Sequence, residues 1–193
     1  IGRPENLFYT TSFGGEDSWL IVLADGTSAL LTDGRFWEEA QNISNCVPYC
    51  QKPGHGLLAL VQDICQEREI TKLAFESDFF TFQIYAALCD KLEGTKLIPC
   101  QGLIENFREI KDAKELALLR QVAAIGDTAF ANTLPHIRPG ITEKELAEIL
   151  RQQLVAAGAD DLSFPTIAAS GPNCSICHAK PGERLLQAGD LVL

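Results

Sequence analysis

Apolar residues follow two different spacings in the first hundred residues of the chain. Short apolar runs that end at turn residues predict β-strands, whereas apolar residues three or four positions apart predict amphipathic helices. The clearest helical stripe consists of Leu57, Leu60, Val61, Ile64 and Cys65. The predicted strands are 19–24, 28–32, 46–51, 72–76 and 96–100, and the predicted helices are 35–43, 57–68 and 80–92.

The order of these elements predicts an α/β domain. Asp25 and Gly26 stand between the first two predicted strands and are typical of a tight hairpin turn. After this hairpin, strands and helices alternate, which predicts a mixed sheet flanked by helices. Residues 4–18 contain a Gly-Gly pair and several polar residues, and they are predicted to form a loop.

The pattern changes near residue 101, beyond which two long helices are predicted. Asp112 with Glu115, and Thr142 with Glu145, each match the capping-box signature of a helix N-terminus. The apolar stripes of these helices are Leu116, Leu119, Val122, Ala123, Gly126, Ala129 and Phe130 in the first and Leu146, Ile149, Leu150 and Leu154 in the second. A Pro-Gly turn is expected between them.

The stretch 164–193 carries the candidate chemistry. Two apolar runs, at 166–169 and from Leu191 onward, are separated by turn residues and predict two strands of one sheet. His178 lies between the runs, after a predicted turn at 170–173. We expect it at the end of the first strand, at the edge of whatever pocket the sheet lines.

The same stretch contains Cys174, Cys177 and His178 in the C-x-x-C-H pattern of covalent haem attachment. Cytochromes c commonly use methionine as the second axial ligand of the iron, and this sequence has no methionine. A zinc site would need a second ligand pair with matching spacing, which the sequence lacks. We therefore interpret the pattern as a coincidence between two small, half-buried cysteines and a histidine.

The residues around His178 resemble a known family. They are Phe164, Pro165, Ile167, Ser170, Gly171 and Asn173 before the histidine, and Gly189, Asp190, Val192 and Leu193 after it. This ordered set is similar to the creatinase/prolidase/aminopeptidase P family, the pita-bread metallopeptidases. The resemblance implies that His178 is a catalytic residue that contacts the substrate and helps to stabilise the reacting centre.

Residues 4–10 and 31–36 resemble the N-terminal domain of the same family. The resemblance implies a creatinase/prolidase-type domain at 1–102 and a linker at 103–111. The first part of an α+β pita-bread catalytic domain would follow at 112–193.

Arg35 is the candidate substrate-binding residue of the N-terminal domain. A guanidinium group can hold a substrate carboxylate through two hydrogen bonds. The alternative is an arginine that pairs with Asp33 or with a helix carboxylate. In the family this domain often lends residues to a neighbouring subunit's active site, so the resemblance also implies a homodimer.

The resemblance further implies hydrolysis of the bond preceding proline in short proline-containing peptides, as an Xaa-Pro dipeptidase or aminopeptidase. The family uses two divalent metal ions, such as manganese, cobalt or zinc, which share an activated water. The family's ligands lie beyond the Gly189-Asp190 segment, so residues 1–193 should hold none of them and be inactive alone. A non-catalytic binding or dimerisation protein of this fold and a metal-free creatinase-like amidinohydrolase are the alternatives.

Composition narrows the partners and the compartment. The formal net charge of −10 argues against nucleic acid or an anionic membrane surface as a partner. No apolar run approaches about 18 residues, so no membrane span is predicted. Seven scattered cysteines favour reduced, buried thiols and a cytoplasmic protein over a disulfide framework.

The two ends of the sequence have one further feature. The chain holds no methionine, and it begins and ends in apolar runs that look like strands cut in the middle. We therefore expect an excerpt of a longer protein, which an intact mass would test.

Overall fold

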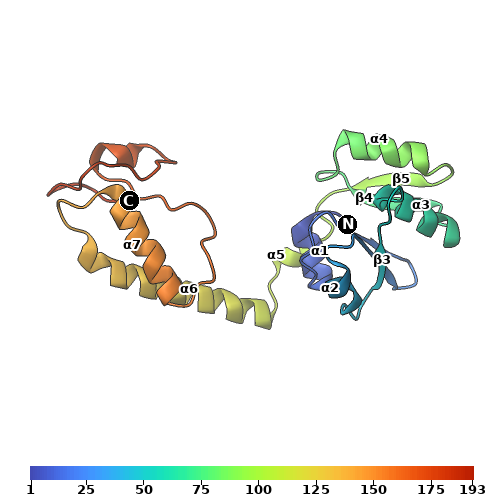
Figure 1. Ribbon diagram of the computed structural model, residues 1–193, viewed down its shortest axis with the longest axis horizontal. Helices are drawn as coiled ribbons and strands as arrows, with labels where there is room; N and C mark the ends of the chain where they lie inside the picture. Colours follow the sequence, from blue (N-terminus) through green and yellow to red (C-terminus); the bar gives the residue numbers. More distant parts are fainter. The chain divides into compact units, whose positions relative to one another are not determined.

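The computed structural model describes residues 1–193, which divide into two compact units, Ile1–Ile110 and Lys111–Leu193 (Figure 1). The first unit contains all the regular β-strands, and both units contain helices. The α/β class that the sequence predicts for the first region is confirmed. The division between the units follows helix α5 (Glu105–Glu109).

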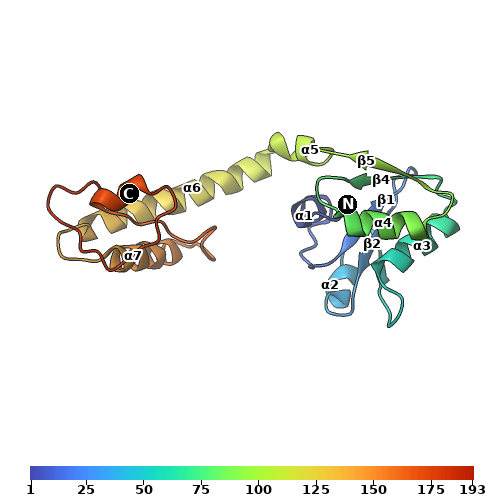
Figure 2. The ribbon, with the colours of Figure 1, turned by 90° about the horizontal axis from the view of Figure 1, so that it is seen from above.

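The strands of the first unit form two small sheets (Figure 2). They are β1 (Trp19–Val22), β2 (Ser28–Thr32), β3 (Val47–Cys50), β4 (Lys72–Glu76) and β5 (Lys96–Cys100). β2 is central in a mixed sheet, antiparallel to β1 and parallel to β3. β4 and β5 make a separate parallel pair. Pro48 and Pro99 both lie on edge strands, where a missing backbone N–H is tolerated.

The mixed sheet buries apolar side chains on both faces because neighbouring residues of a strand point in opposite directions. Leu30 packs with residues of α1 (Pro4–Thr11) and α2 (Trp37–Gln41). Leu31 points to the other face, where it meets residues of α3 (Leu57–Glu67) and α4 (Phe82–Lys91). The first unit is therefore layered, with a sheet between two groups of helices.

Helix α1 contradicts the loop predicted at 4–18. Pro4 is its first residue, where the fixed φ of proline suits a helix and its missing N–H costs nothing. Leu7 is 1% exposed and anchors the helix to the sheet. A single buried leucine is too weak a periodic signal to reveal so short a helix from the sequence.

Asn6, on the same helix, ties α1 to two distant elements, β4 and α5. Its amide nitrogen donates to Glu76 of β4 at 2.5 Å and to Glu105 of α5 at 2.7 Å. Its carbonyl oxygen accepts from Arg108 at 2.9 Å. Both amide protons and the oxygen are thus satisfied, as a fully buried asparagine requires.

The second unit is built on two helices, α6 (Ala113–Thr133) and α7 (Glu143–Ala156), which pack against each other. Both predicted capping boxes are present, at Asp112 with Glu115 and at Thr142 with Glu145. The short 3₁₀ helices η1 (Leu134–His136) and η2 (Gly171–Ser175) complete the regular structure. No helix of the chain combines the length and the apolar character that a membrane crossing needs.

Candidate active site

His178 lies on an exposed β-turn in the second unit. The turn runs from Ile176 to Ala179, and a hydrogen bond from Ala179 N to Ile176 O closes it at 3.1 Å. It follows η2, so the prediction that the histidine ends a strand is wrong. The imidazole makes no hydrogen bond within residues 1–193, which leaves both ring nitrogens available to a ligand.

The two apolar runs beside this turn meet as predicted, although they do not form regular strands. Ala169 and Leu193 exchange backbone hydrogen bonds of 2.9 Å in both directions. Ser170 and Val192 form an isolated antiparallel bridge next to them. The pairing ends with a hydrogen bond from Gly171 N to Leu191 O at 2.8 Å, because Gly171, with a φ of 51°, and Pro172 turn the chain into η2.

Glu143 is a buried carboxylate at this junction that the sequence did not single out. It is the first residue of α7 and is 1% exposed. One carboxylate oxygen accepts from the backbone N of Ser170 at 2.7 Å and from its hydroxyl at 2.9 Å. The other accepts from Gly182 N at 3.1 Å, and the side-chain amide of Asn173 donates to both oxygens.

Burial is the largest influence on the pKa of Glu143, and it acts to raise that pKa. Hydrogen bonds from Asn173, Ser170 and Gly182 act in the opposite direction and together leave the pKa below its usual value. The N-terminal end of α7 also favours a negative charge at this position. Glu143 is therefore ionised at neutral pH.

An ion pair lies beside Glu143. Arg184 donates through two nitrogens to Asp190, at 2.6 and 3.0 Å, and also to the hydroxyl of Ser170. Hydrogen bonding to Arg184 holds the pKa of Asp190 below its usual range. Ser170 thus accepts from the ion pair while it donates to Glu143, so the two charged groups are linked through one hydroxyl.

Arg35 lies in the first unit, between β2 and α2. Its guanidinium binds Asp33 through distances of 2.7 to 3.1 Å and Asp17 at 3.1 Å. It also lies over the ring of Phe36, 5.1 Å from the ring centre. More than half of the side chain is exposed, at 55%. The pairing with Asp33 is the alternative that the sequence left open for this residue.

The cysteines next to His178 form no metal-binding cluster in the structure. The thiol of Cys174 donates to Leu191 O at 3.3 Å and to Ala169 O at 3.4 Å, and Cys177 is exposed. No group of three or more His, Cys, Asp or Glu side chains within residues 1–193 is arranged to hold a metal ion.

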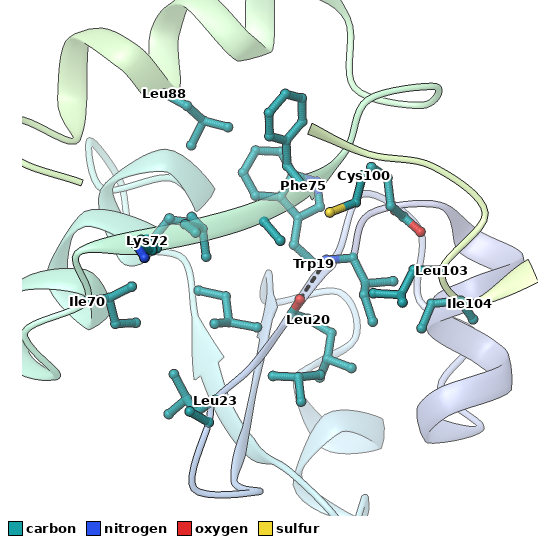
Figure 3. A pocket seen from close by; sticks show the side chains of 18 of the residues that line it. Trp19, Leu20, Leu23, Ile70, Lys72, Phe75, Leu88, Cys100, Leu103 and Ile104 are labelled. Carbon is teal, nitrogen blue, oxygen red and sulfur yellow. Dashed lines mark hydrogen bonds between the residues drawn. The ribbon is translucent and has the colours of Figure 1, made fainter. Parts of the chain in front are cut away.

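A cavity in the first unit, away from His178 in the sequence, has a volume of about 950 Å³ (Figure 3). It lies between β1 and β4, each of which pairs with another strand on one side only. The hydrogen bond drawn in Figure 3 joins Ile1 N to Leu20 O at 2.8 Å. Of the side chains labelled there, only Lys72 is charged. The full lining is mostly apolar, but it also includes Asp25, Arg68, Glu69 and Glu76.

Comparison with known families identifies the class of protein that this fold and this loop define. The creatinase/prolidase N-terminal domain family matches residues 1–110, and metallopeptidase family M24 matches residues 117–193. The chain therefore belongs to the creatinase/prolidase family. Its first unit is the N-terminal α/β domain, and its second is the start of the pita-bread domain.

Individual proteins are similar over the whole chain. An uncharacterised peptidase, YqhT, of Bacillus subtilis is 32% identical over 100% of this chain and 54% of its own length. A putative Xaa-Pro aminopeptidase of Mycoplasma pneumoniae is 28% identical, again over 100% of this chain, and is matched over 52% of its own length. The chain thus spans about half the length of these relatives.

Solved structures agree with the sequence comparison. An Xaa-Pro dipeptidase from Bacillus anthracis superposes with a TM-score of 0.87 at 29% identity, over 97% of this chain and 52% of that one. An X-Pro aminopeptidase from Thermotoga maritima gives a TM-score of 0.86 at 25% identity, over 99% of this chain and 54% of that one.

Proposed function

We propose that the protein is an Xaa-Pro peptidase, which hydrolyses the bond preceding proline in short peptides. The observation that carries this proposal is the ordered match of a creatinase/prolidase N-terminal domain and an M24 metallopeptidase segment along one chain. Similar proteins bear the names Xaa-Pro aminopeptidase and Xaa-Pro dipeptidase. Because this chain spans about half the length of those proteins, the activity is proposed for the whole protein.

In this proposal His178 is a catalytic residue that donates a hydrogen bond to the carbonyl oxygen of the scissile bond. Negative charge grows on that oxygen as the tetrahedral intermediate forms, so the bond strengthens in the transition state. The exposed position of the imidazole and its free ring nitrogens support this role.

The M24 metallopeptidase family implies divalent metal ions. We propose two, with manganese, cobalt and zinc as the candidates; when bound, they supply an activated water as the nucleophile. The residues described here do not fit such a site, since they contain no cluster of metal ligands. None of them is therefore assigned as a ligand.

Arg35 is proposed as a substrate-binding residue, which would exchange Asp33 and Asp17 for a substrate carboxylate. Its exposed guanidinium supports this role. We also propose that the protein is a homodimer of the cytoplasm. Analytical ultracentrifugation of the full-length protein tests the dimer, and cell fractionation tests the compartment.

The deciding experiment is peptide hydrolysis by the full-length protein with manganese, using an Xaa-Pro dipeptide, a longer Xaa-Pro peptide and matched Xaa-Ala peptides. We expect cleavage of the proline peptides only, and loss of activity on chelation. His178→Ala should lower kcat by about 10²–10³, with thermal stability unchanged. His136→Ala, which removes the other exposed histidine of the second unit, is the matched control.

Each other outcome has a defined meaning. Equal turnover of His178→Ala and wild type would remove the histidine from the mechanism. Peptide hydrolysis that survives chelation would contradict the proposed metal requirement, and hydrolysis of a small amidine instead of the peptides would favour the metal-free creatinase-like reaction. No hydrolysis of any peptide by a metal-loaded protein would favour the non-catalytic relative.

A further inference from the structure

His178 lies on a loop, residues 170–182, whose two ends both donate hydrogen bonds to the side chain of Glu143. Figure 1 shows the red C-terminal segment beside the start of α7. There, Glu143 accepts from Ser170 and Asn173 before the histidine and from Gly182 after it. His178 therefore stands on a span of chain whose two ends meet at one carboxylate.

The backbone reinforces this closure. The N–H groups of Glu143 and Lys144, in the first turn of α7, donate to Arg184 O at 3.1 Å and to Gly182 O at 3.2 Å. Helix N–H groups at these positions have no partner inside the helix and need one from elsewhere. The segment after His178 supplies it, so the start of α7 and the loop are fixed to each other.

Glu143 is unsuited to direct chemistry. Its side chain is almost wholly buried, and both oxygens already accept hydrogen bonds from the protein. A general base must reach a proton of the substrate or of a water, and no lone pair of this carboxylate is turned outward. A buried charge costs free energy unless it is satisfied, so a role in holding the loop explains why the charge is present.

We propose that Glu143 is a positioning residue that fixes the His178 loop in the geometry needed for catalysis. This inference rests on the proposed function, because it assigns Glu143 to the action of His178. Glutamine has nearly the same shape, but it replaces one acceptor oxygen with a donor that would face the donors of Asn173 or Gly182. Glu143→Gln should therefore release one end of the loop without changing the volume of the side chain.

The kinetic test is a double-mutant cycle in the full-length enzyme. Glu143→Gln should lower kcat on the order of 100-fold, with KM little changed, because a small misplacement of a catalytic group is costly. In the His178→Ala background the same change should lower kcat by no more than about threefold, because the group that it positions is gone. Additive losses would overturn the proposal. Glu148→Gln is the control, because Glu148 lies on the same helix and forms an exposed ion pair with Arg151. This variant should leave kcat unchanged.

A second readout needs no activity. Cys177 is exposed and Cys174 is partly buried on the same loop, so alkylation followed by peptide mass spectrometry reports on loop order. Glu143→Gln should raise the rate at Cys174 by about tenfold, through local opening, while buried Cys65 stays unchanged. An unchanged rate at Cys174 would overturn the proposal. If the wild-type protein cleaves no Xaa-Pro peptide, the proposed function fails, but these rates still decide whether Glu143 holds the loop.

Discussion

The first unit buries large apolar side chains, whereas the second buries mainly alanines and polar groups. Leu7, Phe13 and Leu30 are at most 1% exposed in the first unit, and both clusters of buried apolar residues lie there. The buried residues of the second unit are Ala129, Thr133, Glu143, Leu146, Ala168, Ala169, Ser170, Ala179 and Leu186. Small side chains let backbone segments approach closely enough to form hydrogen bonds. Hydrogen bonds, rather than apolar packing, therefore hold the His178 loop in place.

This difference predicts that the two units lose their stability under different conditions. Apolar burial contributes roughly in proportion to its area and tolerates changes of pH. A network around buried charges depends on every partner and on the ionisation of its carboxylates. Both tryptophans of the sequence, Trp19 and Trp37, lie in the first unit, so tryptophan fluorescence follows that unit alone. Amide hydrogen exchange follows the second.

The largest effect is expected from the core of the first unit. Leu30→Ala removes a fully buried side chain of β2 and should lower the free energy of unfolding by about 2–5 kcal/mol. Denaturant unfolding followed by tryptophan fluorescence measures the loss. Val47→Ala, at an exposed position of the edge strand β3, should change it by less than about 0.5 kcal/mol. Equal losses for the two variants would show that Leu30 lies outside the core.

The next effect concerns the polar junction of the second unit, which is the hydrogen-bonded group formed by Glu143, Ser170, Arg184 and Asp190. A Cβ added at Gly171 would lie 2.6 Å from both Arg184 Nη2 and Asp190 Oδ1, at a φ of 51°. Gly171→Ala should therefore cost about 2–3 kcal/mol, from backbone strain and displacement of the ion pair. Hydrogen exchange at residues 168–173 measures this cost.

Gly189→Ala is the control for that substitution. Gly189 also has a positive φ, of 88°, but a Cβ there meets nothing within 4 Å. The variant should lose only the strain, about 1 kcal/mol. If Gly171→Ala is no worse than Gly189→Ala, the ion pair does not contribute to the stability of the junction.

A smaller and local effect is expected at Asn6. Asn6→Ala leaves Glu76, Glu105 and Arg108 without their shared partner, which should cost about 1–2 kcal/mol. Because α5 is joined to α1 through this residue, exchange should quicken at 105–109 and stay slow at 57–67. Thr10→Ala, a partly buried change on the same helix, is the control. A uniform increase of the amide exchange rate across the first unit would contradict a local role for Asn6.

The smallest effect is a pH dependence. The pKa values of Glu143 and Asp190 are lower in the folded state than in the unfolded one. The folded state thus binds fewer protons, and the stability that these groups provide is complete above about pH 4.5 and falls as the pH drops below it. The protection of amides in the second unit, measured relative to the intrinsic exchange rate at each pH, should fall between about pH 5 and 3, before tryptophan fluorescence reports the first unit. Glu143→Gln should weaken the pH dependence of the second unit's stability. If the variant responds to acid as the wild type does, Glu143 is not a source of that dependence.

Local signals predicted much of the fold. β4 and β5 occupy the predicted residues, and both capping boxes lie where the pairs Asp112–Glu115 and Thr142–Glu145 indicated. These features depend on residues close together in the sequence. Helix α1 was missed because its residues are mostly polar and its anchor, Leu7, packs on strands that follow later in the chain.

The candidate site was predictable only in part. The pattern around His178 indicated the loop and its histidine, but not the carboxylate that holds it. The donors to Glu143 lie 27, 30 and 39 residues away from it in the sequence. The acidic residue after Thr142 also looks like an ordinary first-turn glutamate of a helix. Such a role depends on a meeting of distant segments, which spacing alone does not reveal.

The bond between Asn6 and Arg108 has a consequence for synthesis on the ribosome. The two residues are 102 positions apart. At elongation rates of about 5–20 residues per second, Asn6 waits roughly 5–20 s before its last partner has been made. Until then the side-chain oxygen of Asn6 lacks this partner and is open to water or to other chains. The first unit therefore completes its folding late, when α5 is translated, and a nascent chain that ends before residue 105 is the form most open to chaperones and proteases.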